Sequence, residues 1–196
     1  SDVCDHHIYA LVSDGDLSEG VSHEAASLAG HLGLGRLVYV YDDNRITIDG
    51  TTDLSLSDDA ARRFEAYGWH VIQLGEASED LDAMTEALEE ARDERDRPSL
   101  VIVRSHIGYP SPEHTDSPAA HGLAFSAEDI TSAKEVMGLP DEPFHVPDDV
   151  LAMYREAGAR GRTQRLDWEQ RARAALAGRE AEWEATLGGR GLPGWE

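Results

Sequence analysis

The sequence contains a single cysteine, Cys4, among 196 residues. One cysteine cannot form an intrachain disulfide, and it cannot supply the thiolate clusters that bind structural zinc or iron–sulfur centres. The histidines other than His121 also lack the spacing of a zinc site, so they read as ordinary surface or packing residues. A protein with so few thiols is typical of a reducing compartment, and we expect a cytoplasmic location.

Basic residues are also scarce, with 17 Lys and Arg against 39 Asp and Glu and a formal net charge of -22. This charge repels the phosphates of nucleic acids and the headgroups of anionic lipids. We therefore expect no nucleic-acid and no membrane partner. A hydrophobic content of 40% is ordinary for a globular domain, so the acidity indicates a well-solvated surface.

No apolar run approaches the length of a membrane span, and the first residues lack the basic and then apolar pattern of a signal peptide. The sequence begins with serine and enters a predicted strand almost at once. We expect it to be a fragment of a longer protein or a subunit that begins within a fold.

Short apolar runs alternate with helical patterns along the first half of the chain. The runs at 8–12, 37–41, 70–74 and 100–103 predict four buried strands. The segments 22–34, 57–67 and 78–95 predict helices, each opening with a possible serine cap. This order predicts an α/β fold, a parallel sheet with helices on both faces.

The second half begins with a segment rich in proline and glycine, 105–122, which predicts a long loop of the kind that is often functional. Helices are predicted at 127–137, 147–158 and 162–187, and the glycine-rich end resembles an interdomain linker. We expect an α/β domain at 1–146, a helical extension at 147–187 and a linker at 188–196 toward a further domain.

Polar residues follow two of the predicted strands, where parallel sheets bind their ligands. Asp14 offers a carboxylate after the first strand, and Asn44 offers an amide oxygen after the second. With the backbone carbonyl of Ile46 they form a plausible oxygen set for Mg²⁺, and Gly15 permits close approach of a phosphate. From these residues alone, the alternative that they are simply turn residues stays open.

Two further residues have both a functional and a structural interpretation. His121, at the end of the predicted loop, can contact a phosphate or transfer a proton near neutral pH, or it can be an exposed loop histidine. Glu19 can be a buried acid that links the site to a partner subunit, or an acid favoured by a helix N-terminus.

The segments around these residues resemble the thiamine-diphosphate fingerprint of transketolases. The matching stretches are SDGDLSEGVSHEAASLAG at 13–30, YDDNRITIDG at 41–50, RFEAYGWHV at 63–71, IGYPSP at 107–112 and AHG at 120–122. The match departs from the family at Ser13, where many relatives have glycine, and in the loop at 113–119 before His121. The resemblance extends from about Asp5 to the linker and implies the fold of the family's diphosphate-binding domain.

The resemblance also implies roles for individual residues. Asp14, Asn44 and the carbonyl of Ile46 would hold Mg²⁺ or Ca²⁺, and Gly15 and Asn44 would contact the diphosphate of thiamine diphosphate. His121 would touch both the cofactor and the sugar substrate and would be the catalytic residue of this chain. Glu19 would belong to the cofactor-binding set.

The implied reaction is the transfer of a two-carbon ketol unit from a ketose phosphate to an aldose phosphate, as in the pentose phosphate pathway. In the family the active site lies at a dimer interface, and the glutamate that activates the cofactor belongs to a pyrimidine-binding domain absent from this sequence. We therefore expect this isolated chain to be inactive until that domain, from the same or another chain, completes a homodimer or heteromer.

Two alternatives remain open at this point. The chain can belong to another thiamine-diphosphate enzyme, such as a two-component transketolase-like synthase or a ketoacid dehydrogenase component. It can also be a structural subunit that keeps the fold without turnover.

Overall fold

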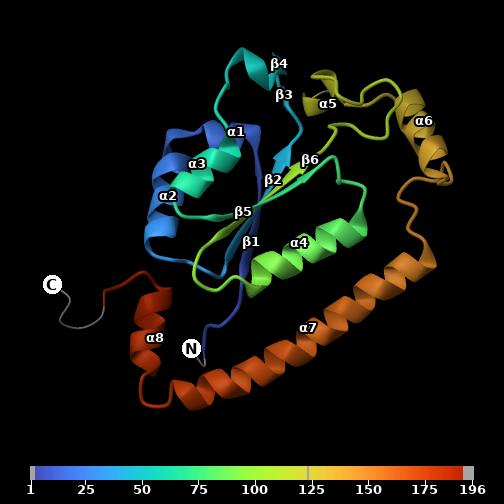
Figure 1. The fold of residues 1–196 in the computed structure, drawn as a ribbon. Helices are drawn as coiled ribbons and strands as arrows, with labels where there is room; N and C mark the ends of the chain where they lie inside the picture. The colour runs from blue at the N-terminus through green and yellow to red at the C-terminus, as the bar shows by residue number, and fades with distance from the viewer. Residues whose placement is uncertain (1–2, 123, 192–196) are drawn as a thin grey trace. The chain divides into compact units, whose positions relative to one another are not determined.

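The computed structural model describes residues 3–122 and 124–191 (Figure 1). The expected linker at 188–196 therefore lies partly outside the described residues. The chain divides into two compact units, one formed by residues 7–143 and the other by residues 1–6 together with 144–196. The first unit contains the sheet and the candidate site.

A sheet of four parallel strands forms the centre of residues 7–143. Its strands are β1 (Ile8–Ser13), β2 (Leu37–Asp43), β5 (His70–Gly75) and β6 (Ser99–Arg104), arranged in the order β1-β2-β6-β5. The four strands occur where the apolar runs predicted them. The register sets Val12 beside Tyr41 and Tyr41 beside Ile102, so the carboxyl ends of β1, β2 and β6 meet at one edge.

Helices cover both faces of this sheet, which confirms the α/β fold class (Figure 1). One face packs against α2 (Gly20–His31) and α3 (Ala60–Ala66) through a core that includes Ala26, Phe64, Trp69 and Leu100. The other face packs against α4 (Leu81–Asp93) through small and branched side chains.

Close contact between α2 and the turn after α3 fixes the first of these faces. The indole N–H of Trp69 donates to the Ala26 carbonyl oxygen at 2.8 Å, and the rings of Phe64 and Trp69 meet edge to face at 5.0 Å. A Cβ on Gly30 would lie 1.8 Å from the Tyr67 carbonyl oxygen, so α2 rests directly on that backbone. Only glycine permits this approach.

The expectation that all four strands are buried is wrong for β1. Leu11 is 82% exposed, and Ile8 and Tyr9 are about half exposed. In this chain β1 is an edge strand, and α4 packs on β5 and β6 without covering it. An apolar run predicts a strand but does not tell which strand lies at an edge.

The expected serine caps are also wrong. The side chains of Asp59 and Asp80 cap α3 and α4, accepting the backbone N–H groups of Arg62 and Ala83. Helix α2 begins after Glu19, whose side chain makes no capping bond. Aspartate caps as well as serine, so a nearby serine does not determine where a helix begins.

Short elements that the sequence did not predict surround the ends of β1 and β2. They are α1 (Asp14–Ser18), the hairpin of β3 (Ile46–Thr47) and β4 (Gly50–Thr51), and a 3-10 turn, η1 (Thr52–Leu54). The long loop after β6 is confirmed, and it ends in one helical turn, α5 (Ala119–Gly122). Helix α6 (Ala127–Met137) has its predicted bounds, with Gly138 left-handed at its end.

The second unit contains α7 (Asp148–Ala175) and α8 (Glu180–Leu187). The predicted break at 158–162 is wrong, because α7 continues through Gly158 and Gly161 and the chain turns near Gly178, which has a φ of 80°. Glycine within a helix costs only about 1 kcal/mol, and the ion pairs Arg160–Glu156 and Arg165–Glu169 on the same helix oppose that cost. Across residues 3–122 and 124–191, none of the helices combines the length and apolar character needed to cross a membrane.

The contact between α2 and the turn at Tyr67 yields a prediction about stability. Gly30→Ala is expected to lower the free energy of unfolding by about 3 kcal/mol, because the new methyl group forces helix and backbone apart. Urea unfolding followed by circular dichroism measures this change. Gly20→Ala is the control in the same helix, since nothing lies within 4 Å of its Cβ. Equal losses in both variants would contradict the prediction.

Candidate functional site

The candidate site lies where β1 and β2 end side by side. Asp14 directly follows β1 as the first residue of α1, which Ser13 and Asp16 cap reciprocally. Asn44 directly follows β2. The two residues are distant in sequence but adjacent in space because their strands are paired in register.

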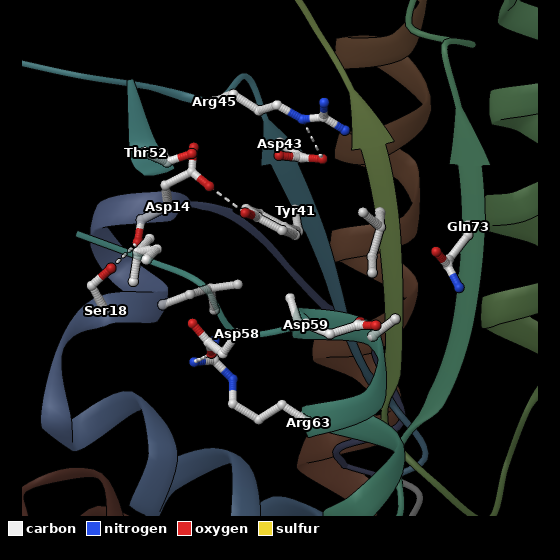
Figure 2. A pocket seen from close by; sticks show the side chains of 15 residues that line it. Asp14, Ser18, Tyr41, Asp43, Arg45, Thr52, Asp58, Asp59, Arg63 and Gln73 are labelled. Carbon is white, nitrogen blue, oxygen red and sulfur yellow. Dashed lines mark hydrogen bonds and ion pairs between the residues drawn. The ribbon is translucent and has the colours of Figure 1, made fainter. Parts of the chain in front are cut away.

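The Asp14 carboxylate is 4% exposed and has one satisfied oxygen. The Tyr41 hydroxyl donates a hydrogen bond to Oδ1, and Figure 2 shows the two side chains pointing toward each other. Among the described residues, no hydrogen-bond partner reaches Oδ2. A buried carboxylate oxygen without a partner is unfavourable, and a bound cation would satisfy it.

Burial governs the protonation of this pair. It raises the pKa of Asp14 above its ordinary value. The hydrogen bond from Tyr41 and the nearby backbone N–H of Arg45 oppose that shift, and the negative charges of Asp43 and Asp42 reinforce it. Burial and the hydrogen bond to Asp14 raise the pKa of Tyr41, so the phenol keeps its proton and acts as the donor. The Tyr41 hydroxyl therefore orients the Asp14 carboxylate.

Asn44 is 9% exposed, and its side chain is held at both ends. Its Oδ1 accepts the backbone N–H of Ile46 at 2.9 Å, and its Nδ2 donates to Asp42 at 3.0 Å. Between them, Arg45 has a φ of 61°, which turns the chain back over Asn44. This bend brings Asn44 and Ile46 to the same cavity.

A cavity of about 440 Å³ collects most of the predicted site residues. Asp14, Gly15, Asn44, Ile46 and His121 all line it. A Cβ on Gly15 would meet only Ser13 Oγ, at 3.7 Å, so the protein itself leaves room for a larger residue there. A ligand that approaches the backbone closely gives a reason for glycine at this position.

Glu19 and His121 occupy different environments from each other. Glu19 is exposed in this chain, precedes α2 and does not line the cavity. His121 is exposed on α5, with its backbone N–H donating to the Pro118 carbonyl oxygen at 3.0 Å. The structure thus brings His121, but not Glu19, to the cavity that Asp14 and Asn44 share.

Sequence reasoning missed Tyr41 and the second cavity that it lines. That cavity, of about 290 Å³, lies against Asp14 and is also lined by Asp43, Arg45 and Arg63 (Figure 2). The available signal was a polar aromatic residue within the apolar run that leads to Asn44. A tyrosine there is also typical of a packed core, so the sequence did not distinguish a hydrogen-bond donor to the site from a packing residue.

These residues fit a divalent cation bound together with a diphosphate. The described residues contain no cluster of three or more His, Cys, Asp or Glu side chains able to hold a metal by themselves. One carboxylate, one amide oxygen and a backbone carbonyl would leave the remaining positions of a hard cation to ligand oxygens, as Mg²⁺ usually requires. The unsatisfied Oδ2 of Asp14 is the observation that supports this fit.

Comparison with known proteins identifies the family. The model of the thiamine-diphosphate-binding domain of transketolase matches residues 1–190. A transketolase of Nostoc sp. is 41% identical over 197 residues, covering 99% of this chain and 29% of the relative. A plasmid-encoded transketolase of Cupriavidus necator is 45% identical over 184 residues, covering 94% of this chain and 25% of the relative.

Solved structures agree with this assignment. Transketolase from Leishmania mexicana superimposes with a TM-score of 0.88 at 33% identity, covering 98% of this chain and 29% of that structure. Transketolase from Pichia stipitis in complex with sedoheptulose 7-phosphate gives a TM-score of 0.86 at 35% identity, with 97% and 29% covered. The chain spans less than a third of the length of these relatives.

The bond between Tyr41 and Asp14 yields a prediction about cation affinity. Tyr41→Phe is expected to weaken divalent-cation binding in the presence of thiamine diphosphate by about 10–100-fold, because the carboxylate loses the donor that orients it. Calorimetric titration of Mg²⁺ on the assembled enzyme measures this effect. Tyr39→Phe, on the same strand and away from Asp14, is the control. Equal affinities in the two variants would refute the orienting role.

Proposed function

Because this chain belongs to the transketolase family through its thiamine-diphosphate-binding domain, we propose that it supplies the diphosphate and metal half of a transketolase site. Asp14, Asn44 and the Ile46 carbonyl hold Mg²⁺ in this proposal, with Ca²⁺ as a substitute. Gly15 and Asn44 contact the diphosphate. The observation that carries the proposal is the buried, unpaired Oδ2 of Asp14 in a cavity shared with Asn44, Ile46 and His121.

The proposed reaction moves a two-carbon ketol unit from a ketose phosphate to an aldose phosphate. Bound thiamine diphosphate supplies the nucleophilic carbon and the electron sink for this carbon–carbon chemistry. The protein binds and orients the reactants. His121 is the residue of this chain that we place at the reacting end, where its imidazole contacts the sugar and exchanges protons near neutral pH.

The remaining parts of the site come from outside this sequence in our proposal. A pyrimidine-binding domain, in the same chain or a partner chain, supplies the other end of the cofactor site within a homodimer or heteromer. The exposed Glu19 belongs at that interface and contributes to cofactor binding there. We place the enzyme in the cytoplasm and in the pentose phosphate pathway, and we expect the isolated chain to be inactive.

Asp14→Asn separates the metal role of this residue from its role in folding. Without metal, the variant is expected to be at least as stable as the parent, because it removes a buried charge and keeps an acceptor for Tyr41. Its magnesium-dependent affinity for thiamine diphosphate is expected to fall by at least about 100-fold, beyond the cost of outer-shell substitutions.

Thermal unfolding and calorimetry of the assembled enzyme measure the two quantities. Asp82→Asn, on the exposed first turn of α4, is the control for losing one negative charge. Undiminished magnesium-dependent affinity for thiamine diphosphate in Asp14→Asn would refute the proposed metal site.

The substrate class is tested with xylulose 5-phosphate as donor and ribose 5-phosphate as acceptor. The assembled enzyme is expected to produce ketol transfer that depends on both Mg²⁺ and thiamine diphosphate. Cofactor binding without ketol transfer would favour another thiamine-diphosphate enzyme. Absence of both would favour a structural subunit.

A further inference from the structure

The loop between β6 and α5 is folded tightly on itself. The backbone N–H of Asp116 donates to the Ile107 carbonyl oxygen at 2.9 Å, which closes the loop across its base. Ser111 is 1% exposed at its centre. A Cβ on Gly108 would lie 2.8 Å from the His114 carbonyl oxygen and 2.9 Å from the Ala120 side chain. The two arms of the loop are therefore in direct contact.

Asp116 is linked through the backbone to the turn that carries His121. The residue after it, Ser117, accepts the backbone N–H of Ala120 at 3.0 Å, and Pro118 accepts that of His121 at 3.0 Å. These bonds form the single turn of α5. A displacement of Asp116 would therefore move the turn that presents His121 to the cofactor cavity.

His106 lies between two carboxylates from different parts of the chain. Its Nδ1 is 2.8 Å from Asp116 Oδ2, and its Nε2 is 3.1 Å from Glu76 Oε2. Glu76 directly follows β5. An imidazole can donate from both nitrogens only when it is protonated. The hydrogen bonds with Asp116 and then Glu76 raise the pKa of His106, which favours that form.

We propose that His106 is a positioning residue, which ties Asp116 to Glu76 and thereby fixes the turn that carries His121. The role in catalysis rests on the proposed function. The tie itself, meaning the bonds of His106 to Asp116 and to Glu76, does not. Among the described residues, His106 makes its hydrogen bonds with Asp116 and Glu76 and not with Asp14 or Asn44, so it acts on the substrate end of the site through the loop.

The backbone at Asp116 has a conformation that favours glycine, yet the residue is aspartate. Asp116 has a φ of 59°, a left-handed conformation that is unfavourable for most residues other than glycine. Glycine would adopt this conformation freely but would have no carboxylate to offer His106. An aspartate here supplies the tie at the expense of local strain.

The charged groups around His106 determine how the tie depends on pH. Asp116 and Glu76 favour the imidazolium, and Arg104 opposes it while also lying 3.8 Å from Glu76. The folded-state pKa is raised, so the stabilisation is fully present below the ordinary histidine value of 6.5. It is lost as the pH rises through the higher, folded-state value. The loop is therefore held most firmly at the acidic end of the neutral range.

Hydrogen exchange of residues 105–122 in this chain, without cofactor or substrate, tests the tie directly. At pH 6, His106→Ala and Asp116→Asn are each expected to speed amide exchange in the loop by about fivefold, a typical effect for a partly exposed ion pair. The double variant should exchange no faster than His106→Ala alone, because both substitutions break the same bond between His106 and Asp116. His31→Asn, at the exposed end of α2, is the control.

Titration of the His106 ring by NMR, together with a charge rescue, separates this role from simple packing. The midpoint should lie above 6.5 in the parent and fall in both Asp116→Asn and Glu76→Gln. His106→Lys keeps a cation at every pH in this range, so it should protect the loop above the pH at which the parent loses protection. A midpoint that neither carboxamide variant moves, or additive effects in the double variant, would overturn the tie.

Kinetics of the assembled enzyme test the consequence for catalysis. His106→Asn should lower kcat/KM for the ketose phosphate about fivefold at pH 6, with thiamine-diphosphate affinity unchanged, and the loss should shrink as the pH rises. A loss in cofactor affinity, or one independent of pH, would overturn the positioning role. Failure of ketol transfer in the parent itself would instead refute the proposed function and leave the exchange and NMR results standing.

Discussion

The site depends on burying the carboxylate of Asp14 with only one of its oxygens satisfied. Tyr41 donates to Oδ1, while Oδ2 has no partner among the described residues. A buried charge in this state destabilises the fold unless a cation joins it, so the arrangement favours a bound state over the apo protein. The paired ends of β1 and β2 make it possible, because Tyr41 pairs with Val12, two residues before Asp14, and Asn44 follows the end of β2. The rest of the sheet and its helices hold that edge in place.

The same register explains how much of the site could be predicted from the sequence. Apolar runs located the strands, and polar residues just after them, Asp14 and Asn44, fall together in any parallel sheet that pairs those strands. Tyr41 could not be assigned in this way, because a tyrosine in an apolar run packs or donates according to contacts that form only in the fold. His106 is a similar case, since its partners lie at Glu76 and Asp116 and no local pattern joins the three.

The incorrect predictions about the fold have a common physical origin. Asp59 and Asp80 replace the expected serine caps, and α7 continues through Gly158, because local propensities differ by only about 1 kcal/mol. A single serine or glycine therefore does not determine where a helix begins or ends. The exposed face of β1 also follows from arrangement, because hydrophobicity marks a strand without giving its position in the sheet. By contrast, the contact of Gly30 with the Tyr67 backbone is a requirement of shape that the sequence around Gly30 does not reveal.

Asp14 and Asn44 are held by a different kind of structure from His121. Asp14 and Asn44 sit at strand ends, buried and bonded to neighbouring strands, so their positions follow the core. His121 sits on one exposed turn, and its position follows a loop that closes through Asp116 and the ion pairs of His106. Substitutions in the loop can therefore shift His121 without disturbing Asp14 and Asn44. The departures from the family pattern lie in this loop, at 113–119, and at Ser13, which lines the cavity beside Asp14. Of the two, the loop is the part that can change without moving Asp14 and Asn44.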